Sequence, residues 1–257
     1  MSKNKEFDEL VTIVEKLRGE DGCPWDKEQT HASLLPFFLE EAYEVIETVD
    51  QEDWHTLAEE LGDILLHVVF QANIAEQNDE FTLQRVISGI NEKLVNRHPH
   101  VFGDKEADGA FNAKQNWEAA KQEEKGRESR LDGVPVTLPA LIRAQRLQQK
   151  AAYVGFDWEE TDQVWNKVHE EMEELKNAES AGAIKHMEEE VGDLFFALVN
   201  LCRFLDISAE DALRKGNQKF TKRFQAVEKE LRRRGKKLEE TDLTEMDKIW
   251  NSQKKST

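Results

Sequence analysis

Cysteine, proline and glycine are scarce in this 257-residue sequence. The two cysteines, Cys23 and Cys202, lie far apart, and neither has the spacing of a CxxC or Cys/His metal site. We therefore expect no disulfide framework and no structural zinc, as is usual in the reducing cytoplasm. No apolar run is long enough for a signal peptide or a transmembrane helix, so a membrane location is not expected.

Basic charge is also in short supply. Lysine and arginine number 35 against 53 aspartates and glutamates, which gives a formal net charge of −18. A surface of this sign repels phosphate backbones, so nucleic acid and anionic membranes are not expected as direct partners. Hydrophobic residues still make up 39% of the chain, which is enough for a core.

Sustained alternation of apolar and polar residues, the pattern of a half-buried strand, is missing as well. Apolar residues recur instead at helical spacing, and the chain has only 13 glycines and 5 prolines to interrupt them. We predict an all-α fold with helices over about 5–18, 32–49, 53–78, 82–96, 112–124, 139–151, 160–178, 183–205, 208–233 and 243–254.

An internal repeat organises these helices. The pattern EExxE at 40–44, followed by ExxD at 60–63, recurs 130 positions later at 170–174 and 190–193. Such self-similarity indicates one structural unit used twice. Glycine and proline gather between the copies, at 99–139. We predict two tandem helical-bundle modules, a first module at 1–130 and a second module at 131–257.

The repeated acidic residues face the core of each module. On a helical wheel Glu41 falls within the apolar stripe and Glu44 at its edge. On the next helix Glu60 falls within the stripe and Asp63 at its edge. Grouped carboxylates repel one another and lose hydration, so a cation must compensate them. Ligands that offer only oxygen suit Mg²⁺ or Mn²⁺. The expected metal ligands are Glu41, Glu44, Glu60 and Asp63 in the first module, and Glu171, Glu174, Glu190 and Asp193 in the second.

These motifs resemble the MazG family of all-α nucleoside triphosphate pyrophosphohydrolases. Further segments that carry the resemblance are GCPWDKEQTHASL at 22–34, NRHPHVFGD at 96–104, LPALIRAQRLQQKAAYVGFDW at 138–158 and NQKFTKRF at 217–224. The resemblance implies a Mg²⁺-dependent homodimer that hydrolyses an NTP between its α and β phosphates to NMP and pyrophosphate. It implies the same eight metal ligands and a second module that carries most of the activity.

Hydrolysis also needs a proton acceptor and groups that bind the substrate. Glu170 or Glu189, each beside a metal ligand, is placed to accept the proton of the attacking water. Lys219, Lys222 and Arg223 lie at helical spacing and suit the phosphate oxygens. The resemblance places the ring of Trp250 on the base. The residues assigned to substrate binding are Lys167, His186, Lys219, Lys222, Arg223 and Trp250. The run RRRGKK at 232–237 is interpreted as a helix C-terminus instead.

Two alternatives remain open at this stage. A ferritin-like di-metal protein also uses inward glutamates, but it needs Glu-x-x-His on two helices. The pairs Glu28/His31 and Glu52/His55 fit that spacing, but the second module has no corresponding pairs. A non-catalytic regulatory module that binds nucleotides is the other alternative, and an assay of pyrophosphate release separates it from an enzyme.

Overall fold

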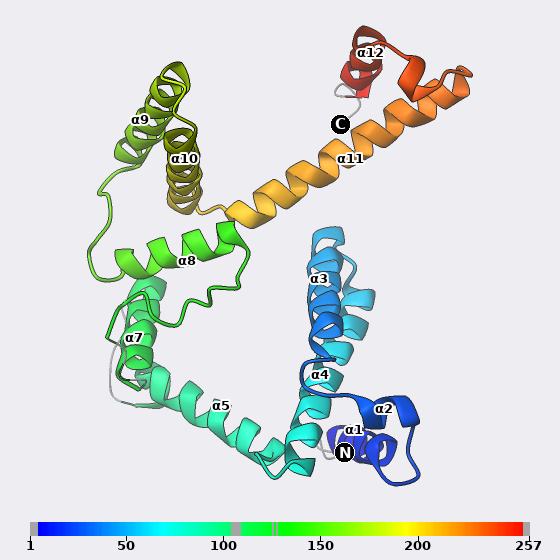
Figure 1. Cartoon of the computed structure of the whole chain (residues 1–257). Helices are drawn as coiled ribbons and strands as arrows, with labels where there is room; N and C mark the ends of the chain where they lie inside the picture. The colour runs from blue at the N-terminus through cyan, green and yellow to red at the C-terminus, as the bar shows by residue number, and fades with distance from the viewer. Residues whose placement is uncertain (1–4, 104–108, 125, 127, 254–257) are drawn as a thin grey trace. The chain divides into compact units, whose positions relative to one another are not determined.

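The computed structural model describes residues 5–103, 109–124, 126 and 128–253, and every regular element among them is helical (Figure 1). The all-α prediction is therefore confirmed. The chain divides into two compact units, Met1–Trp117 and Glu118–Thr257. This division falls within one helix, so the boundary predicted at Arg130 stays a prediction. No helix in the described part of the chain is long and apolar enough to cross a membrane.

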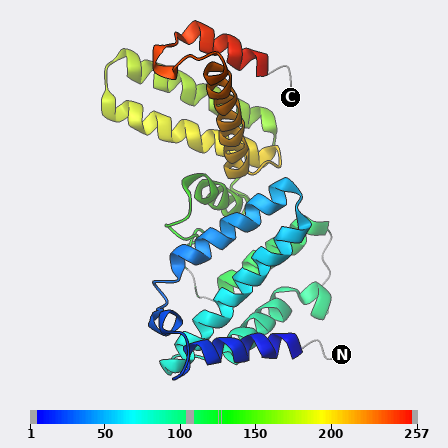
Figure 2. The same ribbon diagram turned by 90° about the vertical axis from the view of Figure 1, so that its right-hand side faces the viewer.

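The first unit is built around a pair of long helices. α3 packs along α4, and α1 and α5 contact α4 as well (Figures 1 and 2). Asp53 caps α4, because its side chain accepts hydrogen bonds from the backbone N–H groups of His55 and Thr56. The helices are α1 (Lys5–Arg18), α2 (Pro24–Glu28), α3 (Leu35–Gln51), α4 (Trp54–Gln77), α5 (Leu83–Arg97), α6 (Pro99–Phe102) and α7 (Gly109–Glu124), the last of which spans the division.

The second unit repeats the long pair. α9 and α10 form an antiparallel hairpin around Val164, Val168, Ala197 and Leu201. α8 packs on α10 and α11, and α12 packs on α11 near Leu231. The elements are α8 (Ala140–Ala152), α9 (Thr161–Ser180), α10 (Ile184–Phe204), α11 (Ala209–Arg233), the short 3₁₀ helix η1 (Leu238–Glu240) and α12 (Leu243–Gln253).

The long helices agree with the sequence prediction to within a few residues, and the short ones do not. No helix was predicted between residues 18 and 32, but Pro24 begins α2, since a proline suits the first turn of a helix. Pro99 begins α6 in the same way, after α5 has ended at Arg97. Residue 254, the predicted end of the last helix, lies outside the described residues.

Candidate functional site

Three predicted metal ligands of the second module meet between α9 and α10. Glu171 and Glu174 lie one turn apart on α9, and Glu190 faces them from α10. One oxygen from each lies within 4.8 Å of the others. Glu171 is only 4% exposed and Glu190 only 7%. The repeat predicted that both face the core, as Glu41 and Glu60 do on the helical wheel, and their burial agrees with that prediction.

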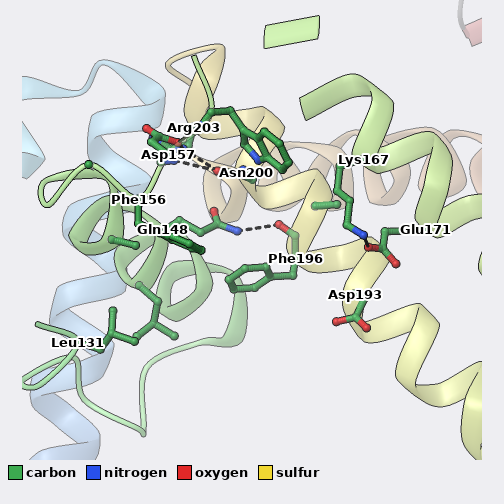
Figure 3. Close-up of a pocket in the computed structure, with 15 residues that line it drawn as sticks. Leu131, Gln148, Phe156, Asp157, Lys167, Glu171, Asp193, Phe196, Asn200 and Arg203 are labelled. Atoms are coloured by element: carbon green, nitrogen blue, oxygen red, sulfur yellow. Dashed lines mark hydrogen bonds and ion pairs between the residues drawn. The ribbon is translucent and has the colours of Figure 1, made fainter. Parts of the chain in front are cut away.

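Asp193, the fourth expected ligand, lies one turn after Glu190 on α10. It is not part of the group of three oxygens. It lines the cavity that Lys167 and Glu171 also line, and Figure 3 shows it on the same side as both. Its carboxylate is therefore near the cluster without joining it in this structure.

Two residues assigned to substrate binding lie against these carboxylates. The Nζ of Lys167 lies 2.7 Å from Glu171 and 2.9 Å from Glu170. These hydrogen bonds hold the pKa of the Lys167 ammonium above its usual range. His186 Nδ1 lies 3.2 Å from Glu190. The sequence had suggested no such pairing, although Lys167 precedes Glu171 by four residues and His186 precedes Glu190 by four, a spacing at which helical side chains meet.

The two candidate proton acceptors lie at the edge of the cluster. Glu170 is paired with Lys167, and Glu189 lies 3.6 Å from His186. Both carboxylates are exposed to solvent. Water therefore reaches either group, and the choice between them stays a prediction.

The first module brings together a different set of its expected ligands, and Glu44, the fourth of them, lies outside that group of three oxygens. Glu41, Glu60 and Asp63 have oxygens within 4.8 Å of one another. Burial, followed by the charges of Asp63 and Glu44, raises the pKa of Glu41 to about 7. Burial and Glu44 also raise the pKa of Glu60. The positions that correspond to Lys167 and His186, at the offset of 130, hold Phe37 and Thr56.

The structure does not bring the basic residues of α11 to the carboxylates. Arg223 lies over the ring of Trp250 at 5.9 Å, and that ring also packs 5.3 Å from Phe220. Lys219 and Lys222 are exposed. Within the described ranges, no hydrogen bond or ion pair joins these four predicted substrate-binding residues to the cluster. Their contact with phosphate or base remains a prediction.

The basic run that follows α11 has a structural role. Arg233 and Arg234 each lie 2.8 Å from Glu230, and Lys236 lies 2.6 Å from Glu245 at the start of α12. The arginines lower the pKa of Glu230 to about 2. The run therefore stabilises the end of α11 and its junction with α12, in agreement with the interpretation as a helix C-terminus.

A cavity of about 760 Å³ adjoins the second cluster (Figure 3). It lies between α8, the following loop, α9 and α10, and its lining includes Gln148, Phe156 and Asn200. At its far end Arg203 pairs with Asp157 at 2.8 Å. The sequence analysis missed these residues as a site. Gln148, Phe156 and Asp157 lie in the segment 138–158, which was quoted for the resemblance and given no role.

Comparisons with known proteins agree on one family. The MazG nucleotide pyrophosphohydrolase domain matches this chain twice, at residues 29–102 and 159–228. A Thermotoga maritima protein named nucleoside triphosphate pyrophosphohydrolase/pyrophosphatase MazG is 46% identical over 250 residues, which cover 96% of this chain and 95% of the relative.

Relatives in other bacteria cover different shares of the chain. The nucleoside triphosphate pyrophosphohydrolase of Escherichia coli K12 is 43% identical over 256 residues, 97% of each chain. That of Mycobacterium tuberculosis is 41% identical over 149 residues, which cover 57% of this chain and 45% of the relative. Two domain matches and full-length relatives above 40% identity show that this chain belongs to the MazG nucleotide pyrophosphohydrolase family.

Proposed function

We propose that this chain, a nucleoside triphosphate pyrophosphohydrolase by family, cleaves NTPs between the α and β phosphates to NMP and pyrophosphate. The observation that carries the proposal is the convergence of Glu171, Glu174 and Glu190 within 4.8 Å, two of them buried. We assign Mg²⁺ as the cofactor, held by these three residues and Asp193, with Mn²⁺ as a substitute.

The donor set fits such an ion. Buried carboxylates are stable only when a cation balances them, and their oxygens match the preference of Mg²⁺ for hard ligands. Burial and the charges of Glu190 and Glu171 raise the pKa of Glu174, which is the effect expected of a cluster that lacks enough positive charge. When bound, the ion neutralises the triphosphate and lowers the pKa of a coordinated water.

The chain's own residues supply the remaining steps. Lys167 holds Glu171 and lines the cavity, so its ammonium lies where a phosphate oxygen would approach the carboxylates. Glu170 or Glu189 accepts the proton of the attacking water. Lys219, Lys222 and Arg223 of α11 bind phosphate oxygens, and His186 and Trp250 complete the substrate site.

A homodimer is part of the proposal. Large apolar side chains lie exposed on α3, α10 and α11, among them Phe38, Phe195 and Phe220. Apolar surface of this extent favours burial against another chain, and a second copy offers the same faces. Light scattering at micromolar concentration should give twice the mass of one chain. We also propose a cytoplasmic location, in keeping with the scarcity of cysteine, and no direct binding to nucleic acid or membrane, in keeping with the acidic charge.

The products of hydrolysis identify which phosphate bond is cleaved. ATP incubated with the protein and Mg²⁺ should give equimolar AMP and pyrophosphate on anion exchange, and EDTA should stop it. Glu171→Gln should remove most of the turnover, whereas Glu173→Gln, a change of a neighbouring exposed glutamate of α9, should retain it. ADP and phosphate as products would contradict the proposed bond.

The two alternatives have less support. His31 contacts Gln71 and Glu80, and His55 lies at the capped start of α4. Neither belongs to a metal-binding group in the described part of the chain, so a ferritin-like site is not favoured. A regulatory module that binds nucleotides without turnover would be favoured only if ATP bound and neither AMP nor pyrophosphate formed.

A further inference from the structure

The loop between α8 and α9, residues 153–160, carries exposed aromatic side chains. Phe156 is 80% exposed and Trp158 is 44% exposed, and both line the cavity beside the second cluster. Side chains this exposed bury little apolar surface, so they contribute little to holding the loop in place. The loop is fixed instead by hydrogen bonds at both of its ends and in its middle.

Local hydrogen bonds fix the two ends of the loop. At the first end Gly155 has a φ of 84°, a left-handed conformation that glycine adopts without strain, and the backbone N–H of Phe156 donates back to α8 at 3.1 Å. At the second end Gln163 Oε1 accepts hydrogen bonds from the backbone N–H groups of Glu159 and Glu160, at 2.9 and 3.0 Å. These bonds join near neighbours in the sequence, so they do not tie the loop to α10.

Arg203 ties the middle of the loop to α10. Its Nη1 donates to Asp157 Oδ2 at 2.8 Å, and its Nη2 donates to Asp157 Oδ1 (Figure 3). Its Nε and Nη2 also donate to Asn200 Oδ1, at 3.0 and 2.8 Å, and its guanidinium lies over the ring of Phe204 at 4.6 Å. The Arg203 side chain is 15% exposed and that of Asp157 27%, so water and salt screen the pair only weakly. Paired bonds of this kind fix direction as well as distance.

This tie lies in the same cavity as the predicted metal ligands. Arg203 and Asp157 line one end of the cavity, and Lys167, Glu171 and Asp193 line the other (Figure 3). A nucleotide bound at the carboxylates therefore lies next to the loop. If the loop were free to move, binding would have to order it, and that ordering would lower the affinity. A loop that is ordered beforehand avoids this loss.

We infer that Arg203 is a positioning residue for the proposed reaction, because through Asp157 it holds the α8–α9 loop in place before the substrate binds. Both residues lie at the end of the cavity away from the carboxylates, so the pair acts on binding and not on bond cleavage. The inference rests on the proposed function, since an NTP at the carboxylates is the ligand that meets the loop. Loss of the tie should raise KM and leave kcat in place, the pattern of an interaction that is equal in the ground state and the transition state.

The test is Arg203→Met, which removes every donor of the tie. The matched control is Arg146→Met, which removes an arginine paired with Glu118 at 3.1 Å, in the same module but outside the cavity lining. Pyrophosphate release is measured over a range of ATP concentrations. We expect Arg203→Met to raise KM about tenfold while kcat changes less than about twofold, and Arg146→Met to change neither. Hydrogen exchange at residues 154–160 should be faster in Arg203→Met alone.

Two milder variants keep the test independent of whether Arg203→Met folds. Arg203→Lys keeps the charge but cannot bond both oxygens of Asp157 and Asn200 together, so its KM should lie between those of the parent and Arg203→Met. Asp157→Asn should raise KM in the same direction. Combined with Arg203→Met it should raise KM no further, because both changes break one contact.

Three results would overturn the inference: a fall in kcat with KM unchanged, equal effects of Arg203→Met and Arg146→Met, or hydrogen exchange at 154–160 that Arg203→Met does not alter. If the parent releases no pyrophosphate, the proposed function fails, and titration calorimetry with ATP still tests the loop. A Kd for ATP that rises in Arg203→Met and not in Arg146→Met would support the inference. Equal ATP binding by the two variants, or no ATP binding by the parent, would overturn it.

Discussion

At the scale of single residues, the two carboxylate clusters balance their charge differently. In the second module Lys167 and His186 pair with Glu171 and Glu190. In the first module Phe37 and Thr56 occupy the corresponding positions, and the cluster takes up a proton instead, as the raised pKa of Glu41 indicates. The two clusters should therefore respond differently to pH and to loss of metal.

The first residue-scale prediction concerns Glu41. Its pKa rises from 4.5 in the unfolded chain to about 7 in the folded one, so the folded state favours the protonated form. The cost of ionising Glu41 is absent below about pH 4.5, grows as pH rises through this window and is complete above about 7. Metal-free Glu41→Gln should therefore melt at a higher temperature than the parent at pH 8.

Calorimetry in EDTA at pH 5 and pH 8 measures the difference. The gain in Tm from Glu41→Gln should be larger at pH 8. Glu47→Gln, on the same helix and outside the cluster, is the control and should show the same small effect at both values. An equal gain for Glu41→Gln at both pH values would contradict the role of repulsion in this cluster.

The second residue-scale prediction concerns Lys167→Met. The change leaves the buried Glu171 without its cation, so the metal-free protein should lose about 1 kcal/mol of stability. The loss of stability is small because the Lys167 side chain is 37% exposed, so water screens its ion pair with Glu171. Mg²⁺ should restore part of the loss, since it supplies positive charge to the same carboxylate. Lys176→Met, an exposed lysine of α9, should need no rescue.

At the scale of elements, the α9–α10 hairpin should depend on metal as a unit. Both helices contribute ligands, so an ion that binds only the folded hairpin stabilises it by mass action. We expect the Tm of the parent to rise steadily with Mg²⁺ through the millimolar range, and Glu190→Gln to flatten that rise. A melting curve indifferent to both Mg²⁺ and EDTA would count against the metal site.

The α11–α12 pair leads to a prediction about phosphate. Lys219→Ala and Arg223→Ala should raise KM about tenfold for ATP, GTP, CTP and UTP alike, because the phosphates are common to all four. Lys229→Ala, another exposed lysine of α11, should leave KM unchanged. Trp250→Ala should instead change the ratios among the bases. Unequal effects of Lys219→Ala on the four nucleotides would argue against a phosphate contact.

The sequence predicted some of these elements and contacts and missed others. Helical periodicity predicted the long helices. The acidic motifs predicted four ligands in each module, and three of them meet in each, without Glu44 in the first and without Asp193 in the second. The short helices at Pro24 and Pro99 were missed because four or five residues show no periodicity. The cavity was missed because Gln148 and Phe196 meet through the packing of α8 on α10, which no local pattern encodes.

At the scale of the whole molecule, the two modules share a pair of long helices that bears carboxylates, and they differ in the helices and side chains around that pair. The first module packs Arg18 on Phe70, and its fifth helix ends before Pro99. In the second module a cavity adjoins the carboxylates, and α11 runs uninterrupted from Ala209 to Arg233. A helix that ends before a proline presents fewer basic residues to a phosphate chain.

The last prediction follows from that asymmetry. The second module should carry most of the turnover, while the first mainly supports assembly and retains at most weak or differently selective hydrolysis. Two double variants test this: Glu41→Gln with Glu44→Gln, and Glu171→Gln with Glu174→Gln, each assayed for AMP and pyrophosphate over the same four nucleotides. The second pair should reduce kcat at least a hundredfold, as loss of metal ligands does, and the first should leave most of it. Turnover that survived the second pair and vanished with the first would assign catalysis to Glu41, Glu44 and their neighbours instead.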